Sequence, residues 1–139
     1  MNTPNEGMLV KLSEIDETVA DRSDDIRGRK VIDAAGEHLG KVKDLLIDEE
    51  ENRVRFIEVA SGGFLGIGQD TVLIPVDAIT AIDDDDVRID QSRQRVASAP
   101  TYDPDLVRER ETYSQYLTYY GYPMWWGTGY NYPDYPNYR

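Results

Sequence analysis

Between residues 27 and 99 the apolar residues fall into short runs that turn-forming residues separate. The clearest run is RVRFIEVA, residues 53–60, in which Arg53, Arg55 and Glu58 take the polar positions. Its apolar face switches between Phe56 and Ile57, which indicates either a β-bulge or burial on both faces. Strands of roughly four to eight residues with a turn after each are typical of a small β-barrel or β-sandwich.

The neighbouring runs fit the same pattern. Gly36 supplies the permissive backbone of the first turn, and proline at position 75 ends a strand because it has no N–H to donate. Asp83–Asp86 reads as a solvated hairpin tip, and LVKLSEI, residues 9–15, alternates weakly enough to add a short strand. The further predicted strands are RKVIDA (29–34), LGKVKDLLIDE (39–49), TVLIP (71–75), the end of VDAITAI (76–82) and VRID (87–90).

Aromatic residues divide the chain. All ten tyrosines and both tryptophans lie at Tyr102 or later, which predicts a boundary near Ala99 and Pro100. Asp103 as N-cap, Pro104 in the first turn and Gly121 as a stop signal predict a helix. We therefore expect an acidic N-terminal arm (1–26), a mostly β barrel domain (27–99), a helical extension (100–120) and a Tyr/Pro/Gly-rich tail (121–139).

The glycine-rich stretch SGGFLGIGQDTVLIP, residues 61–75, raises the possibility of a phosphate-binding loop. Such a loop leads from a strand into the N-terminus of a helix, whereas this stretch leads into another strand and lacks the GxGxxG spacing. It is better interpreted as a long hairpin connection. Phe64 and Leu65 at its tip are apolar and form a candidate contact surface.

The residue types of common catalytic and metal sites are sparse. The chain has one histidine, His38, and no cysteine, so a multi-histidine or thiolate site within one chain is excluded. The acidic run that starts at Asp83 fails as an EF-hand because Arg88 and Gln94 occupy the positions that need glycine and glutamate. We expect no enzyme activity, catalytic residue, cofactor or metal, and a weak divalent-cation site at the acidic turn is the minor alternative.

The net charge of −12 limits the classes of partner. Such a surface repels nucleic-acid phosphates and anionic membranes, so we expect neither as a partner. No apolar run approaches the roughly 18–20 residues of a membrane span. The acidic N-terminal residues lack the basic and apolar regions of a secretory signal, which predicts a cytoplasmic protein.

The aromatic tail is the strongest candidate for contacts with other proteins. Tyrosine and tryptophan offer large contact area at low entropic cost and dominate binding hot spots. The tail is either an adhesive arm or a segment that folds back on its own barrel or stays disordered, and the sequence does not decide between them. The candidate contact residues are Phe64, Leu65, Tyr113, Tyr116, Tyr120, Tyr122, Trp125 and Trp126.

Residues 25–99 resemble the PRC-barrel domain. The family pattern opens with G-x-x-V-x-D-x-x-G-x-x-hydrophobic-G-x-V-x-D and closes with a proline-led element. The residues that match are Gly28, Val31, Asp33, Gly36, Leu39, Gly40, Val42, Asp44, Pro75, Val76 and Ala78. The resemblance implies a barrel of about six strands that docks onto other proteins, with no family-wide catalytic residue. It also implies relationship to the cytoplasmic domain of the photosynthetic reaction-centre H subunit and to stand-alone bacterial members linked with stress.

Three hypotheses follow. The first is a non-catalytic interaction module that forms a homodimer, with any other protein partner unknown. The second is a soluble accessory of a membrane or photosynthetic electron-transfer complex. The third is a weak binder of cations or small ligands.

Overall fold

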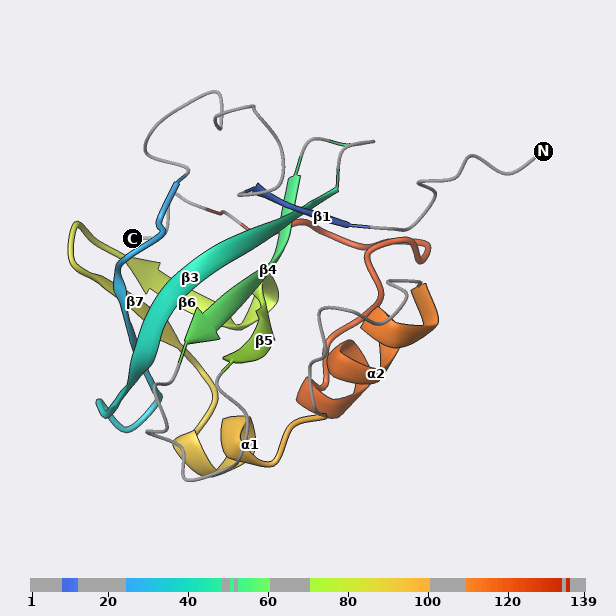
Figure 1. The fold of residues 1–139 in the computed structure, drawn as a ribbon. Coiled ribbons are helices and arrows are strands. Elements are labelled where there is room, and N and C mark those ends of the chain that lie inside the picture. Colours follow the sequence, from blue (N-terminus) through green and yellow to red (C-terminus); the bar gives the residue numbers. More distant parts are fainter. Residues whose placement is uncertain are drawn as a thin grey trace.

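A computed structural model describes residues 9–12, 25–48, 51, 53–60, 71–100, 110–133 and 135. Figure 1 shows a strongly twisted sheet with helix α2 packed beside it. The strands are β1 (Val10–Lys11), β2 (Lys30–Ile32), β3 (His38–Asp48), β4 (Arg53–Ala60), β5 (Thr71–Pro75), β6 (Ile79–Ile82) and β7 (Asp86–Ile89). The helices are the 3₁₀ turn η3 (Val76–Ala78), α1 (Arg93–Ala97) and α2 (Arg110–Tyr120).

The sheet has the strand order β5-β4-β3-β2-β7-β6, and β1 pairs with β3. The first half of β3 pairs with β2 and its end pairs with β1, while β4 runs along its other edge. β2 and β7 pair in parallel although most of the barrel sequence separates them. Within the described residues the two end strands β5 and β6 are joined by η3 and do not pair, so the sheet stays open. The predicted mostly β fold with a C-terminal helix is confirmed.

The central strands are buried on both faces. In β4 every residue from Val54 to Val59 is buried, and in β3 the last five residues are buried. The predicted irregularity in β4 is present as a register shift: Leu46 pairs with Phe56 and Ile47 with Val54, which leaves Arg55 as the additional residue. A bulge re-aims the side chain of its extra residue. Arg55 is buried at this bulge, and Glu58, another position predicted only as polar, is buried as well.

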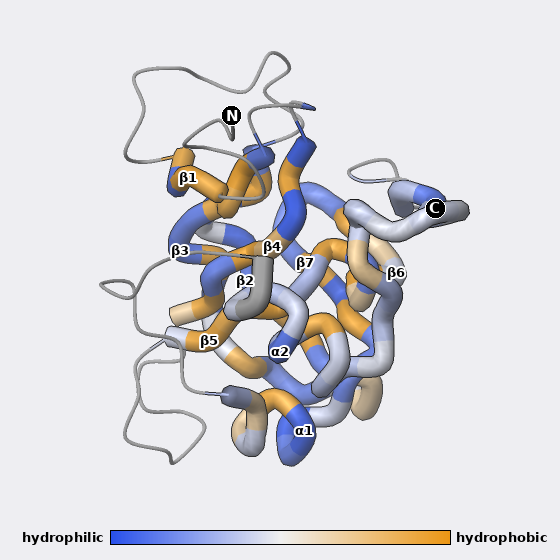
Figure 2. Tube along the Cα trace, turned by 90° about the vertical axis from the view of Figure 1, so that its right-hand side faces the viewer, coloured by the Kyte–Doolittle hydropathy of each residue, from blue (hydrophilic) through white to orange (hydrophobic). Residues whose placement is uncertain are grey.

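Two apolar clusters fill the molecule. The larger cluster lies inside the sheet and contains residues such as Leu39, Ile57 and Ile74. The smaller one, called here the outer cluster, lies between the sheet and α2; its buried members are Leu9, Leu46, Phe56, Leu73, Tyr113, Tyr116 and Leu117. The hydrophobic positions in Figure 2 accordingly follow the strands.

Local signals explain the turns and helix ends. Asp33 Oδ1 accepts hydrogen bonds from the N–H groups of Ala35 and Glu37, which closes the turn predicted at Gly36. α2 ends at Gly121 as predicted, with a φ of 87°, and Gly121 and Tyr122 both donate to the carbonyl of Leu117. The predicted start of this helix near Asp103 lies outside the described residues.

Helix α1 was not predicted. Ser92 caps it by accepting a hydrogen bond from the Arg95 N–H, and the Arg93 N–H donates to Asp33 Oδ2 across 60 residues of sequence. Val96 is its buried residue. Two adjacent apolar residues in five, Val96 and Ala97, give no helical periodicity, so this short helix depends on its cap and on Asp33.

Candidate functional site

The candidate site is the segment that follows α2, residues 121–133, together with the part of the sheet that it covers. This stretch is called here the aromatic segment. It leaves α2 at Gly121, turns where the Gly127 N–H donates to the Met124 carbonyl, and uses a positive φ again at Gly129. It lies against β4, η3 and the end of β7.

Three tyrosine hydroxyls attach the aromatic segment to three separate elements. The Tyr132 hydroxyl donates to the carbonyl of Val54 in β4 at 2.9 Å. The Tyr130 hydroxyl donates to Asp77 Oδ2 in η3 at 2.9 Å. The Tyr122 hydroxyl donates to Asp90 Oδ1, just after β7, and accepts from Gln91 Nε2. The aromatic segment contains several glycines and prolines and forms no helix or strand. Hydrogen bonds are directional, so these three bonds determine the path of its backbone.

Aromatic contacts join the segment to the outer cluster. The Phe56 ring on β4 lies 5.5 Å from the Tyr113 ring, 6.2 Å from Tyr116 and 6.0 Å from Trp125, measured between centroids. Trp126 packs edge-on against Trp125 at 4.6 Å. Trp125, Trp126 and Met124 are only partly buried, so the outer cluster continues to the molecular surface as an apolar edge.

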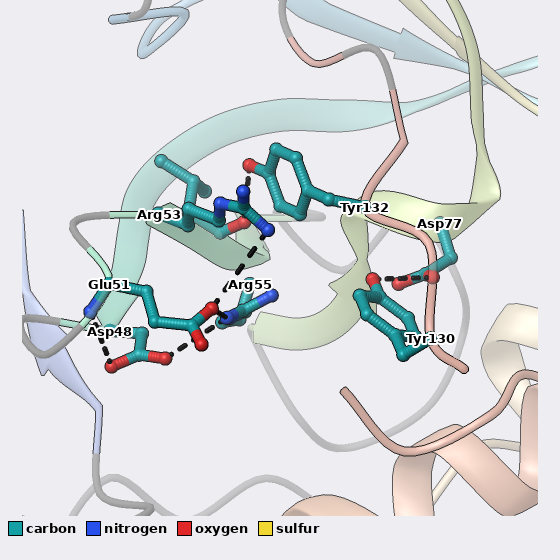
Figure 3. A network of polar contacts seen from close by, with 8 residues as sticks. Asp48, Glu51, Arg53, Arg55, Asp77, Tyr130 and Tyr132 are labelled. Atoms are coloured by element: carbon teal, nitrogen blue, oxygen red, sulfur yellow. Dashed lines mark hydrogen bonds and ion pairs between the residues drawn. The ribbon is translucent and has the colours of Figure 1, made fainter. Parts of the chain in front are cut away.

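Beneath the segment lies a buried arginine (Figure 3). The Arg55 side chain is 1% exposed, and its Nη2 lies 3.1 Å from Asp48 Oδ2 and 2.5 Å from Glu51 Oε2. Among the described residues its Nε and Nη1 have no hydrogen-bond partner. The guanidinium carbon instead lies 5.2 Å from the centroid of the Trp125 ring and 5.5 Å from that of Tyr132. Cation–π attraction to these rings partly replaces the missing hydrogen bonds.

A second buried charge lies further along β4. Glu58 is 1% exposed, and its Oε1 is 3.5 Å from Lys11 Nζ on β1. A buried carboxylate is stabilised by a partner of opposite charge, and this ion pair links β1 to β4 across β3.

The aromatic segment also lines, together with Asp77 of η3, a solvent-open pocket of about 490 Å³. Asp77 provides its carboxylate, and burial raises the pKa of this carboxyl above the ordinary value although the hydrogen bond from Tyr130 acts in the opposite direction. Burial likewise raises the pKa of the Tyr130 and Tyr122 hydroxyls. The pocket is lined by Asp77, Tyr122, Pro123, Met124, Gly127, Thr128, Gly129, Tyr130, Asn131 and Pro133.

In the acidic turn, residues 83–86, a side chain accepts hydrogen bonds from the backbone of the same turn. Asp83 Oδ1 accepts hydrogen bonds from the N–H groups of Asp85 and Asp86, and these bonds lower the pKa of the Asp83 carboxyl. The adjacent cleft mixes acidic residues with Arg27, Arg29, Lys30 and Lys41. In the described part of the chain no group of three potential metal ligands gathers.

Six of the eight predicted contact residues lie among the described residues; Tyr113 and Tyr116 belong to the outer cluster, Trp125 and Trp126 pack against it, and Tyr120 belongs to the larger one. Tyr113, Tyr116 and Tyr120 are buried within their own chain, whereas Tyr122, Trp125 and Trp126 are partly buried in the aromatic segment. Phe64 and Leu65 lie outside the described residues. Of the two alternatives for the tail, the described part folds back on the sheet, and its role in contacts with other proteins stays a prediction.

Arg55 and Asp77 were not predicted as site residues, whereas Tyr130 and Tyr132 lie in the predicted aromatic tail (121–139) without being among the eight candidate contact residues. One signal was available for Arg55, because it stands between Val54 and Phe56 at the place where the apolar face switches. Asp77 carries no such signal, since its environment is created by a segment some fifty residues later.

The family model of the PRC-barrel domain matches residues 19–96, more than half of the chain. This match points to a non-catalytic module in general. No curated protein matches the sequence. Neither α1 nor α2, nor any other described helix, is long and apolar enough to cross a membrane.

Proposed function

We propose that this protein, which belongs to the PRC-barrel domain family, is a non-catalytic interaction module. In this proposal it self-associates through its aromatic segment. The sheet is the scaffold, and the first partner is a second copy of the chain. The observation that carries the proposal is the apolar edge formed by Met124, Trp125 and Trp126, which extends the buried outer cluster to the surface.

The two tryptophans have different roles in this proposal. Trp125 contacts Phe56, Tyr113 and Arg55, so it belongs to the fold. Trp126 packs edge-on against Trp125 and is the residue that we assign to the interface. A large aromatic residue at the centre of an apolar patch is the usual form of a binding hot spot.

Charge supports a protein partner and a symmetric arrangement. The net charge of −12 disfavours nucleic acid. An acidic molecule with one apolar edge buries that edge most simply in a two-fold dimer, in which the same patch meets itself. We therefore expect a dimer whose axis passes near Trp126, and no catalysis.

Sedimentation velocity of the full chain from low to high micromolar concentration tests the proposal. The wild type should shift from monomer to dimer as concentration rises. Trp126→Ser should cost about 2 kcal/mol or more of association free energy, which is roughly a thirtyfold higher dissociation constant. Trp126→Phe keeps an apolar ring and is the matched control, and thermal melting verifies that both variants are folded.

Two results would contradict the proposal. One is a wild type that stays monomeric at every concentration. The other is a dimer that Trp126→Ser leaves unchanged, since the interface would then lie elsewhere on the molecule.

A further inference from the structure

The pocket between η3 and the aromatic segment has a composition suited to an organic cation. It is open to solvent, holds about 490 Å³, and is mostly apolar apart from Asp77, Thr128 and Asn131. Tyr122, Tyr130 and Met124 are among the residues that line it. Pockets that combine aromatic faces with a carboxylate recognise cationic groups.

Asp77 has unused capacity as an acceptor. Its Oδ2 accepts the hydrogen bond from the Tyr130 hydroxyl, and its own backbone N–H also supports the carboxylate. No other described residue donates a hydrogen bond to it. Arg55 favours the charged form of this carboxylate from nearby, but its guanidinium bonds to Asp48 and Glu51 instead. Burial opposes the charge on Asp77, so an incoming cation would be stabilised there.

The same part of the chain already holds guanidinium groups against aromatic rings. The guanidinium carbon of Arg53 lies 4.6 Å from the centroid of the Tyr132 ring, and that of Arg55 lies 5.2 Å from Trp125. Elsewhere, the guanidinium carbon of Arg95 lies 4.5 Å from the centroid of the Tyr119 ring on α2. A planar, weakly hydrated guanidinium stacks on rings and pairs with a carboxylate more readily than a strongly hydrated ammonium does.

We propose that this pocket binds the guanidinium of an arginine side chain on a partner protein. Asp77 is its counter-ion through Oδ1, and the rings of Tyr122 and Tyr130 are its apolar walls. The overall negative charge attracts such a partner, and it disfavours an anionic ligand in the same pocket. An uncharged apolar ligand would leave the Asp77 carboxylate buried without compensation.

This inference rests on the proposed function, because it names the chemistry of a protein partner. Its test does not involve self-association, so the two can fail separately. Sedimentation can show a dimer while the pocket binds nothing, and the pocket can bind arginine in a protein that stays monomeric.

The experiment titrates the full chain with capped arginine, which is acetylated at its N-terminus and amidated at its C-terminus. Binding is monitored by the NMR chemical shifts of the Tyr130 and Gly129 amides. Capped citrulline is the matched ligand control, because it has nearly the same shape without the charge. Capped lysine tests the preference for guanidinium. Asp77→Asn is the protein variant, and Asp84→Asn on the β6–β7 turn is its control for the loss of one negative charge.

We expect saturable binding of capped arginine with a dissociation constant of ~1 mM, a realistic affinity for one side chain. Citrulline and lysine should bind more weakly. Asp77→Asn should weaken arginine binding about tenfold or more, as expected for loss of a charged hydrogen bond, and Asp84→Asn should leave it unchanged. Equal binding of arginine and citrulline, equal effects of the two variants, or no saturable shift would overturn the proposal.

Discussion

The Tyr132 hydroxyl donates a hydrogen bond to the backbone carbonyl of Val54, which lies 78 residues earlier in the sequence. The bond connects the aromatic segment to β4 next to the bulge at Arg55, and the Arg53 guanidinium covers the same tyrosine ring. Tyr132 is thus one of the three tyrosines that hold the aromatic segment in place, and it is the one that bonds to β4.

Tyr132→Phe should therefore destabilise the protein. The phenylalanine keeps the ring contact with Arg53 but removes the hydrogen bond to Val54, at a cost of about 0.5–1.5 kcal/mol in the free energy of unfolding. Urea denaturation measures this difference. An unchanged free energy of unfolding would mean that the hydroxyl bonds equally well to water.

Tyr120→Phe is predicted to have the opposite sign. The Tyr120 side chain is buried, and its hydroxyl has no hydrogen-bond partner among the residues described. Burial also raises the pKa of this hydroxyl. Removing a buried, unsatisfied polar group should leave stability unchanged or raise it by up to about 1 kcal/mol. A clear loss of stability in the same urea experiment would reveal a partner for this hydroxyl.

The two arginines of β4 should differ strongly when each is replaced by alanine. Arg55→Ala removes the partner of the buried Asp48 and should cost about 3–5 kcal/mol of unfolding free energy. Arg53 is 45% exposed and 3.9 Å from Glu51, so Arg53→Ala should cost less than about 1 kcal/mol. Thermal and urea unfolding of both variants measure the contrast. Similar losses for the two would contradict the burial of the Arg55 ion pair.

Asp77→Asn should show a pH-dependent difference from the wild type. Because the folded state raises the pKa of Asp77, the charged carboxylate weakens the fold at neutral pH, and this penalty disappears as the carboxyl is protonated. The asparagine variant should thus be at least as stable as the wild type at pH 7. The difference should vanish as the pH falls below the ordinary value of 3.8. Urea denaturation between pH 7 and pH 3 measures the difference in unfolding free energy between the two proteins. A variant that is less stable than the wild type at pH 7 would contradict the prediction.

A shortened chain that ends at Ala99 should lose much of its stability. The missing residues include Tyr113, Tyr116 and Leu117, each of which contributes about 1.5–3 kcal/mol when fully buried. Their loss exposes Phe56, Leu46 and Leu73 on the sheet. Urea denaturation and binding of a hydrophobic dye measure the effect. Equal unfolding free energies for the short and full chains would show that the sheet is stable without its aromatic cover.

The strands could be predicted well because their signals are local. RVRFIEVA matches β4 residue for residue, and the turn at Gly36 and the helix stop at Gly121 depend on their own neighbourhoods. The parallel pairing of β2 with β7 could not be predicted from periodicity, since alternation does not say which strands become neighbours.

The candidate site was less predictable because distant residues create it. Arg55 is buried by the Trp125 and Tyr132 rings, and Asp77 acquires its environment from Tyr130. The sequence could show that the tail is rich in aromatic residues. It left open whether those rings cover their own sheet, because hydroxyl-to-carbonyl bonds such as that of Tyr132 have no sequence pattern.

The outer cluster has a consequence for protein synthesis. The ribosome completes Leu46, Phe56 and Leu73 before it makes α2 and the aromatic segment that cover them. At about 5–20 residues per second, the remaining chain takes on the order of several seconds to appear. During that interval the nascent sheet presents an apolar face to chaperones and to neighbouring nascent chains on the same message, so the C-terminal residues also determine how long a newly made molecule needs protection.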